Sequence, residues 1–257
     1  MTADRAYFDW NATAPLRPAA RAAMLAALDA PGNASSVHGE GRGTRRLIEE
    51  ARRQVAALAG AEAKQVTFVS GATEANALAL TPAIEADGNK APRDRLFVSA
   101  VEHPSVLAGG RFAPEQVEIL PVDRDGRVDP ATLAAALAKA ERPLVSVMLA
   151  NNETGVIQPI AEIAGIVHAA NGLLHIDAVQ AAGRIPLDMS ALGADLMSLS
   201  SHKLGGPQGA GALIVRGRLS VAPLIRGGGQ ERGIRAGTEN VAAIAGFGAA
   251  AEAARAS

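Results

Sequence analysis

Cysteine is absent from this 257-residue sequence, and its absence removes several kinds of chemistry at once. The chain can form no disulfide, has no thiol nucleophile and cannot hold zinc or an iron–sulfur cluster through cysteine. Aromatic residues make up only 3% of the chain, so alanine, leucine, valine and isoleucine must fill the core. We therefore expect a core of small aliphatic side chains and predict no metal site.

Excess charge and long apolar runs are also lacking. The net charge is −1, which gives no electrostatic reason to expect nucleic acid or an anionic membrane as a partner. No apolar run approaches the ~20 residues that a membrane span needs, and the first residues contain no apolar signal core. We therefore expect a cytoplasmic protein that binds neither nucleic acid nor membrane.

Lysine occurs only four times, at Lys64, Lys90, Lys139 and Lys203. The first three lie in a polar link, a polar loop and a helix end, where each is expected to be a solvated surface charge. Lys203 instead lies between an apolar run and a glycine-rich turn. Burial there would lower the pKa of its amine and make it more nucleophilic. An ordinary loop lysine is the competing interpretation.

The stretch around Lys203 contains three strand-like runs. Residues 173–176 lead to Asp177, residues 195–199 end shortly before Lys203, and residues 212–215 follow the turn. In a buried sheet the residues just past neighbouring strand ends converge on one crevice. Lysine can form a Schiff base with an aldehyde, and a carboxylate can hold a pyridine nitrogen protonated. The pair therefore predicts a pyridoxal phosphate site.

Three further positions at predicted strand ends could contribute to that site. The helix that begins at Ala72-Thr73 would present free N–H groups to a phosphate, although a simple threonine cap is the alternative. His103 could stack on a flat ring or move protons, whereas a lone histidine there is usually structural. The asparagine pair ending at Asn152 follows an apolar strand and favours hydrogen bonding.

The remaining pattern alternates strands and helices. Apolar runs predict further strands at 66–70, 96–100, 117–120 and 143–150, and periodicity predicts helices at 18–28, 44–59, 72–85, 130–140, 159–170 and 241–255. We interpret Gly39 to Gly43 as a turn, since no strand precedes it as a dinucleotide fingerprint requires. The glycine-rich stretch 227–240 is expected to be mobile. The order predicts an α/β fold whose roughly seven-stranded sheet is covered on both faces.

Eight segments together resemble the NifS/IscS-like cysteine desulfurases of the class V aminotransferase family, within fold type I of the pyridoxal phosphate enzymes. The segments are FDWNATAP, GNASSVHGEGR, VSGATEANALAL, EHPSVL, LANNETGVIQPI, HIDAVQAAGRIPLD, SLSSHKLGGPQGAGAL and GGGQERGIRAGTEN. The resemblance implies a three-layer α/β/α fold with a mostly parallel sheet, pyridoxal 5'-phosphate as cofactor and a homodimer. It implies conversion of L-cysteine, or a related amino acid, to L-alanine. The sulfur would pass to acceptor or scaffold proteins for iron–sulfur cluster or thio-cofactor biosynthesis.

The resemblance also implies roles for individual residues. Lys203 would bind the cofactor covalently, Asp177 would face the pyridine nitrogen, and His103 would stack on the ring and shuttle protons. Gln180 would bond the phenolic oxygen, and Asn152 would touch both the cofactor and the substrate carboxylate. The phosphate would be held by Ala72, Thr73, Ser200 and His202, together with Thr238 of the other subunit.

The chain departs from the family in one important respect. Family members continue into a C-terminal small domain that carries a loop cysteine and a substrate-binding arginine. We expect residues 1–15 to be the N-terminal segment that would join that domain, residues 16–257 to be the cofactor-binding large domain, and the small domain to be absent. Without cysteine the chain is expected to form no persulfide. A non-catalytic remnant that binds pyridoxal phosphate, or a cysteine-independent enzyme such as a selenocysteine lyase-like β-eliminase, are the alternatives.

Overall fold

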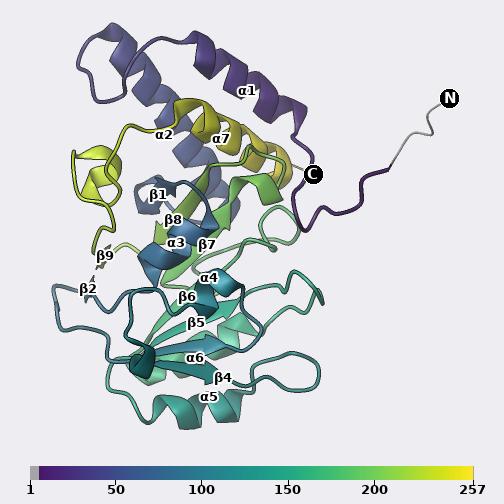
Figure 1. The fold of residues 1–257 in the computed structure, drawn as a ribbon, viewed down its shortest axis with the longest axis vertical. Helices are drawn as coiled ribbons and strands as arrows, with labels where there is room; N and C mark the ends of the chain where they lie inside the picture. The colour runs from purple at the N-terminus through teal and green to yellow at the C-terminus, as the bar shows by residue number, and fades with distance from the viewer. Residues whose placement is uncertain (1–5, 257) are drawn as a thin grey trace.

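A seven-stranded sheet runs through the molecule in the computed structural model, which describes residues 6–256 (Figure 1). The strand order is β1-β8-β7-β6-β5-β3-β4. Neighbouring strands from β4 to β7 are parallel, while β8 runs antiparallel to both β1 and β7. The predicted α/β class with a mostly parallel sheet is confirmed. The strands are β1 (Val66–Val69), β3 (Leu96–Ser99), β4 (Val117–Leu120), β5 (Leu144–Met148), β6 (Leu173–Asp177), β7 (Leu196–Ser200) and β8 (Gly211–Val215).

The sheet separates two apolar cores because alternate side chains of each strand point to opposite faces. In β3, Leu96 and Val98 belong to one core and Phe97 to the other. The larger core also contains side chains from α1 (Pro18–Asp29), α2 (Gly39–Ala59), α5 (Pro130–Leu137), α6 (Ile160–Ala169) and α7 (Val241–Arg255). The smaller core contains α3 (Ala72–Ala79), α4 (Pro104–Leu107) and a two-stranded sheet of β2 (Ile84–Ala86) and β9 (Leu219–Val221).

Helix α2 begins at Gly39, five residues before its predicted start at Thr44, so the turn predicted at Gly39 to Gly43 is wrong. His38 caps the helix, because its Nδ1 accepts a hydrogen bond from the Gly41 N–H at 3.4 Å. Gly41 fits only without a side chain, since a Cβ there would lie 2.5 Å from the Ser36 carbonyl oxygen. The glycine therefore serves close packing within a helix rather than a turn.

Helix α3 ends at Ala79, so the helix predicted over 72–85 is too long. Pro82 explains the early end, because proline clashes with the preceding turn of a helix and disfavours helical geometry at the residue before it. The chain then forms β2, whose partner β9 is far away in the sequence. Local pattern alone could not reveal that pairing.

The glycine-rich stretch 227–240 is anchored at Glu231, contrary to the expectation of a mobile loop. The Glu231 side chain is buried and accepts hydrogen bonds from Arg52 at 2.7 and 2.8 Å, and from the Phe68 N–H at 2.8 Å. Burial by itself lowers the pKa of Arg52, but the bonds and charge of Glu231 outweigh it and raise that pKa. The buried pair fastens the loop to α2 and β1.

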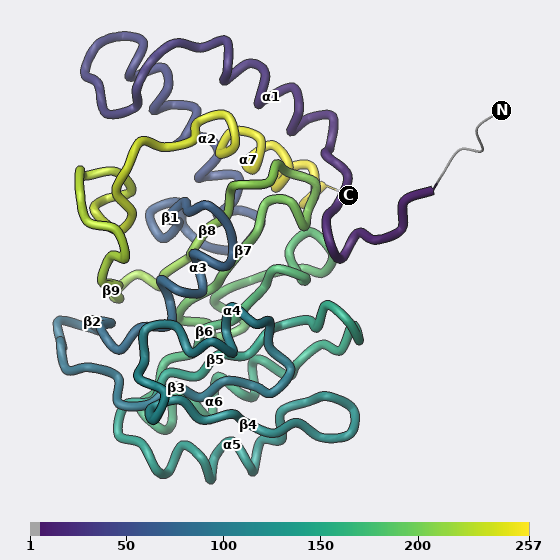
Figure 2. The backbone as a smooth tube through the Cα atoms, in the orientation of Figure 1, coloured from purple at the N-terminus to yellow at the C-terminus, as the bar shows by residue number. Residues whose placement is uncertain are grey.

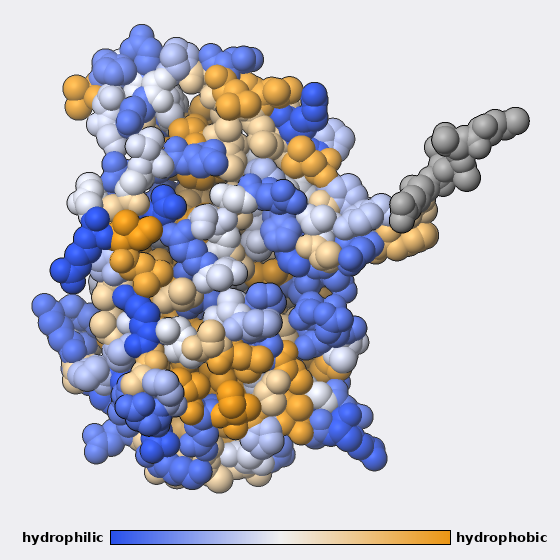
Figure 3. Space-filling view, in the orientation of Figure 1, coloured by the Kyte–Doolittle hydropathy of each residue, from blue (hydrophilic) through white to orange (hydrophobic). Residues whose placement is uncertain are grey.

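The backbone before α1 runs beside the loop after β7, as the trace in Figure 2 shows and as the bond from Ala14 N to the His202 oxygen at 2.9 Å fixes. Residues 1–5 of the predicted 1–15 segment lie outside the described residues. Several large apolar side chains near this segment are exposed, Phe8 at 88% and Trp10 at 53%. On the face in Figure 3, apolar areas are separated by polar ones. Within residues 6–256, no helix has the length and apolar character to span a bilayer.

Candidate active site

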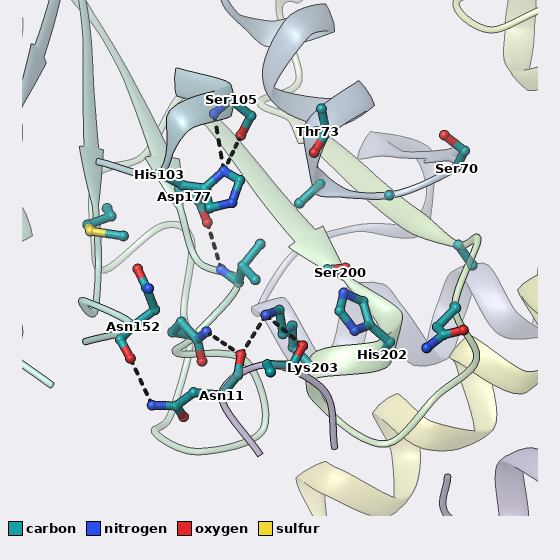
Figure 4. Close-up of a pocket in the computed structure, with 18 of the residues that line it drawn as sticks. Asn11, Ser70, Thr73, His103, Ser105, Asn152, Asp177, Ser200, His202 and Lys203 are labelled. Carbon is teal, nitrogen blue, oxygen red and sulfur yellow. Dashed lines mark hydrogen bonds between the residues drawn. The ribbon is translucent and has the colours of Figure 1, made fainter. Parts of the chain in front are cut away.

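A cavity of about 870 Å³ lies where strands β1, β3, β5, β6 and β7 end (Figure 4). Nearly all of the predicted site residues line it: Ala72, Thr73, His103, Asn152, Asp177, Gln180, Ser200, His202 and Lys203. Thr238 lies instead in a neighbouring cavity of about 200 Å³, whose wall shares Ser70 and Gly209 with the first. Within residues 6–256, no group of three or more histidine, aspartate or glutamate side chains could hold a metal ion.

Asp177 ends β6 and is 5% exposed. Its Oδ2 accepts from Asn76 Nδ2 at 3.0 Å and its Oδ1 from the Val179 N–H at 3.0 Å. Burial raises the pKa of this carboxyl, although those two bonds and the charges of His103 and Lys203 oppose the rise. Within the described part of the chain no cationic side chain forms an ion pair with Asp177. A buried carboxyl group without a direct ion-pair partner suits a cationic ligand group such as a protonated pyridine nitrogen.

Lys203 ends the short helical turn Ser201–Lys203 that follows β7. Its Nζ donates to the backbone oxygens of Asn11 at 2.5 Å and Ala12 at 3.0 Å. Burial and the charge of Arg184 lower the pKa of the amine. The structure thus bears out the predicted direction, and it places the other three lysines at the surface, with 69%, 80% and 60% of their side chains exposed.

His103 follows β3 and caps α4. Its Nδ1 accepts from the Ser105 N–H at 3.1 Å and lies 2.8 Å from the Ser105 hydroxyl, which in turn accepts from Asn76 Nδ2 at 3.0 Å. With Nδ1 used as the acceptor, the neutral ring carries its proton on Nε2. Asn76 therefore links Asp177 to His103 through Ser105.

Asn76 and Ser105 are functional candidates that sequence reasoning missed. Asn76 is fully buried, and an amide on the inward face of a helix must find hydrogen-bond partners. Its place between Ala75 and Leu78, both core residues, was the available signal. No comparable signal marks Ser105, whose role follows only from the three-dimensional arrangement.

The other end of the cavity is built for an anion. Helix α3 begins at Ala72-Thr73, where backbone N–H groups lack partners within the helix and favour negative charge. Ser200 and His202 line the same cavity. Gly211 lets β8 pass close beside this turn, because a Cβ on Gly211 would lie 2.6 Å from the Gly71 carbonyl carbon. The donors at this end suit a phosphate group.

Gln180 and Asn152 are both joined to Asn11. Gln180 Nε2 donates to the Asn11 oxygen at 3.0 Å, and Gln180 Oε1 accepts from Arg184. Asn11 Nδ2 donates to the Asn152 oxygen at 2.9 Å, while the Asn152 side chain bonds Glu153 Oε1 at 2.6 Å. Sequence reasoning gave Asn11 no role, and nothing in its local pattern distinguished it from an ordinary turn residue.

Glu102 is a buried acid directly beside His103 in the chain. Its Oε1 accepts from the Ser99 hydroxyl at 2.5 Å and from the Met148 N–H at 2.5 Å. Its Oε2 is buried and has no hydrogen-bond partner among the described residues. Burial, reinforced by the charge of Asp177, raises the pKa of Glu102 to about 8. The acid is therefore protonated at neutral pH.

Comparison with known proteins gives a consistent result. The aminotransferase class-V family model matches residues 6–256. A cysteine desulfurase of Cereibacter sphaeroides is 46% identical over 97% of this chain and 65% of its own length. The cysteine desulfurase IscS of Dictyoglomus turgidum is 45% identical over 96% of this chain and 63% of its own length. This chain thus spans slightly less than two thirds of these curated relatives.

Solved structures agree with the sequence relatives. The NifS-like protein from Rickettsia africae superposes with a TM-score of 0.88 at 39% identity, covering 96% of this chain and 68% of its own. A structure described as SspA in complex with cysteine gives a TM-score of 0.85 at 31% identity, covering 96% of this chain and 72% of its own.

Proposed function

The chain belongs to the aminotransferase class-V family, whose cofactor is pyridoxal 5'-phosphate, and we propose that it forms the cofactor-binding part of a cysteine desulfurase. The predicted resemblance and the predicted cofactor are thereby confirmed. The observation that carries the proposal is that Asp177 and Lys203, at the ends of adjacent strands, line one cavity. The names of the relatives, and the cysteine complex of one of them, support cysteine as substrate.

The residues present fit the cofactor at both ends of the cavity. Asp177 is a buried carboxylate in need of a positive partner, and the start of α3 with Ser200 and His202 offers donors to a phosphate. Lys203 supplies the amine that would hold the cofactor covalently, and Gln180 supplies an amide donor beside it. When bound, the cofactor supplies an electron-withdrawing ring that makes the Cα–H of an amino acid acidic.

The chain's own residues then handle protons and orientation. His103 presents Nε2 as its proton-bearing atom, since Ser105 holds Nδ1. Lys203, with a pKa lowered by burial and by Arg184, exchanges a proton more readily than an exposed lysine. Asn152 lines the cavity, and we assign it contact with the cofactor and the substrate carboxylate.

The proposed overall reaction takes L-cysteine to L-alanine while its sulfur passes to a thiol. Because this chain contains no cysteine, the receiving thiol must be outside it. We propose delivery to acceptor or scaffold proteins for iron–sulfur cluster or thio-cofactor synthesis, and a homodimer in which Thr238 reaches the phosphate of the second subunit. Thr238 is exposed and does not line the cavity that contains Lys203, so it is free to contact a second subunit.

The lack of cysteine also favours a second candidate, a site that binds cofactor without transferring sulfur to a protein thiol. Such a chain would either be inert or eliminate the substituent at Cβ, as a β-eliminase would. Product analysis separates these functions: sulfur transfer yields alanine, whereas elimination from cysteine yields pyruvate, ammonia and sulfide. For this chain alone we expect little or no alanine from L-cysteine, and robust alanine formation would contradict that expectation.

The test of the proposed site is cofactor binding followed by visible absorbance. The purified chain mixed with pyridoxal 5'-phosphate should acquire an absorbance band that survives gel filtration. Lys203→Ala should remove the band, whereas Lys139→Ala, which alters an exposed lysine paired with Glu118, should keep it. A folded chain that shows no band, or a band that persists in Lys203→Ala, would refute the assignment.

A further inference from the structure

The segment Asp9–Ala14, which we call the strap, borders the cavity, because Asp9, Asn11 and Ala12 line it. Asn11 lies beside Lys203 (Figure 4). The Ala14 N–H donates to the His202 oxygen at 2.9 Å, and the Thr13 hydroxyl lies 3.1 Å from His202 Nδ1. Asn11 Nδ2 donates to the Asn152 oxygen at 2.9 Å. The strap is thus fastened at three points to the loops that follow β5 and β7.

The fastening leaves two backbone carbonyls facing Lys203. Its Nζ donates to the Asn11 oxygen at 2.5 Å and to the Ala12 oxygen at 3.0 Å. A lysine ammonium has three donors and no acceptor, and bonds from a charged donor are about twice as strong as neutral ones. Two fixed carbonyl oxygens therefore stabilise the protonated amine over the neutral one.

We propose that the paired carbonyls of Asn11 and Ala12 form an ammonium seat that holds Lys203 protonated while it is not bonded to the cofactor. Asn11 is then a positioning residue, because the hydrogen bond from its side-chain amide to the Asn152 oxygen holds the seat in place. The inference rests on the proposed function in one respect: the proposed cofactor is the group with which Lys203 would react after leaving the seat. The seat itself is a property of the cofactor-free chain.

Opposing electrostatic contributions act on Lys203 in the seat. Burial and Arg184 disfavour a positive charge on Lys203, while Asp9 and Asp177 favour it. Arg184 is held close because it donates to the Trp10 oxygen of the strap at 3.0 Å. His202 lies on the same turn and has a pKa lowered by burial and by Lys203. The carbonyls oppose the unfavourable contributions and keep the amine in one position.

Acylation of Lys203 in the cofactor-free protein tests the seat, because only a neutral amine attacks an acylating reagent. Acetic anhydride would be applied at low dose and the modification of each lysine measured by peptide mass spectrometry. The other three lysines, all exposed, serve as internal references. In Asn11→Ala we expect Lys203 to be acylated about fivefold faster at about pH 8, with its rate profile shifted to lower pH.

Two further variants make the test specific. Thr13→Val removes the hydroxyl contact with His202 and should also increase the acylation rate of Lys203. Asn33→Ala removes an exposed asparagine that does not line the cavity and whose Oδ1 accepts from the Ser35 N–H, and it should leave all four acylation rates unchanged. Asn11 is exposed and lies outside every helix and strand, so the fold survives its truncation.

Two outcomes would contradict the proposed seat. One is unchanged or slower acylation of Lys203 in both strap variants. The other is an equal increase in the acylation rates of the reference lysines, which would indicate that the whole fold has loosened. The assay contains no cofactor, so it is independent of the absorbance test. A chain that never binds pyridoxal phosphate could still show the seat, and a chain that binds it could lack the seat.

Discussion

Replacing Glu102 by glutamine should remove a pH-dependent loss of stability. In the folded chain the pKa of Glu102 is raised to about 8 from an ordinary value of 4.5, chiefly by burial. The folded state therefore keeps the proton through a range of pH in which the unfolded chain releases it. Stability falls as pH rises through that range, since the unfolded state gains the free energy of ionisation.

The size of the effect follows from the two pKa values. One pKa unit of difference between the folded and unfolded states corresponds to about 1.4 kcal/mol. A pKa of about 8 in the folded chain and 4.5 in the unfolded chain therefore lowers the free energy of unfolding by about 5 kcal/mol once the pH reaches about 8. Glutamine is neutral at every pH, and its amide oxygen can accept the same bonds from Ser99 and Met148. The variant should thus gain on the natural chain by several kcal/mol between about pH 5 and about pH 8.

Urea unfolding of the cofactor-free chain at several pH values measures this difference. Because both proteins contain every other titrating group, subtraction of their unfolding free energies isolates Glu102. Glu115→Gln, at an exposed position, serves as the matched control and should run parallel to the natural chain. Parallel curves for Glu102→Gln and the natural chain would refute the assignment of a proton to the buried acid.

Two other predictions concern buried groups that do not line the cavity. His175 is fully buried between the hydroxyls of Ser146 and Ser198, and burial lowers its pKa to about 3. In this pH range His175 binds a proton in the unfolded chain but not in the folded chain, so stability should fall as pH drops from about 6.5 toward about 3. His175→Gln should remove up to about 5 kcal/mol of that fall in urea titrations, and an unchanged acid slope would contradict this reasoning. Arg52→Met should cost about 3 to 5 kcal/mol by urea unfolding, because it leaves the buried Glu231 carboxylate without its partner. A loss below about 1 kcal/mol would show that the pair does not anchor the loop.

Local pattern predicted most of the elements and the common location of the site. Helix α7 has the predicted bounds, and β4 has the bounds of the strand predicted at 117–120. Strand ends follow from runs of apolar residues, and in a parallel sheet those ends necessarily meet. Nine of the ten predicted site residues share one cavity. Gln180, Ser200 and His202 were assigned through the family resemblance and not through the strand pattern, and the individual roles of all ten remain proposals.

Contacts between distant segments could not be predicted in this way. Asn11 reaches Lys203 across 192 positions and Glu231 reaches Arg52 across 179. Neither partner carries a local pattern that selects the other, because the pairing depends on how the sheet and helices pack. The errors at α2 and α3 have a different origin, since there the signals were present. His38 and Pro82 marked the true ends, and glycine content and apolar periodicity were given too much weight.

The placement of β8 has a consequence for biosynthesis. Val66–Val69 finds its neighbour in the main sheet only in Gly211–Val215, a stretch translated more than a hundred residues later. At ordinary ribosomal speeds that delay amounts to roughly ten seconds. During that time the apolar side of α2 and the edge of β1 that pairs with β8 lack their final contacts. Strands β3 to β6 can already pair with one another. The early third of the polypeptide is thus the part most in need of a chaperone at the tunnel exit.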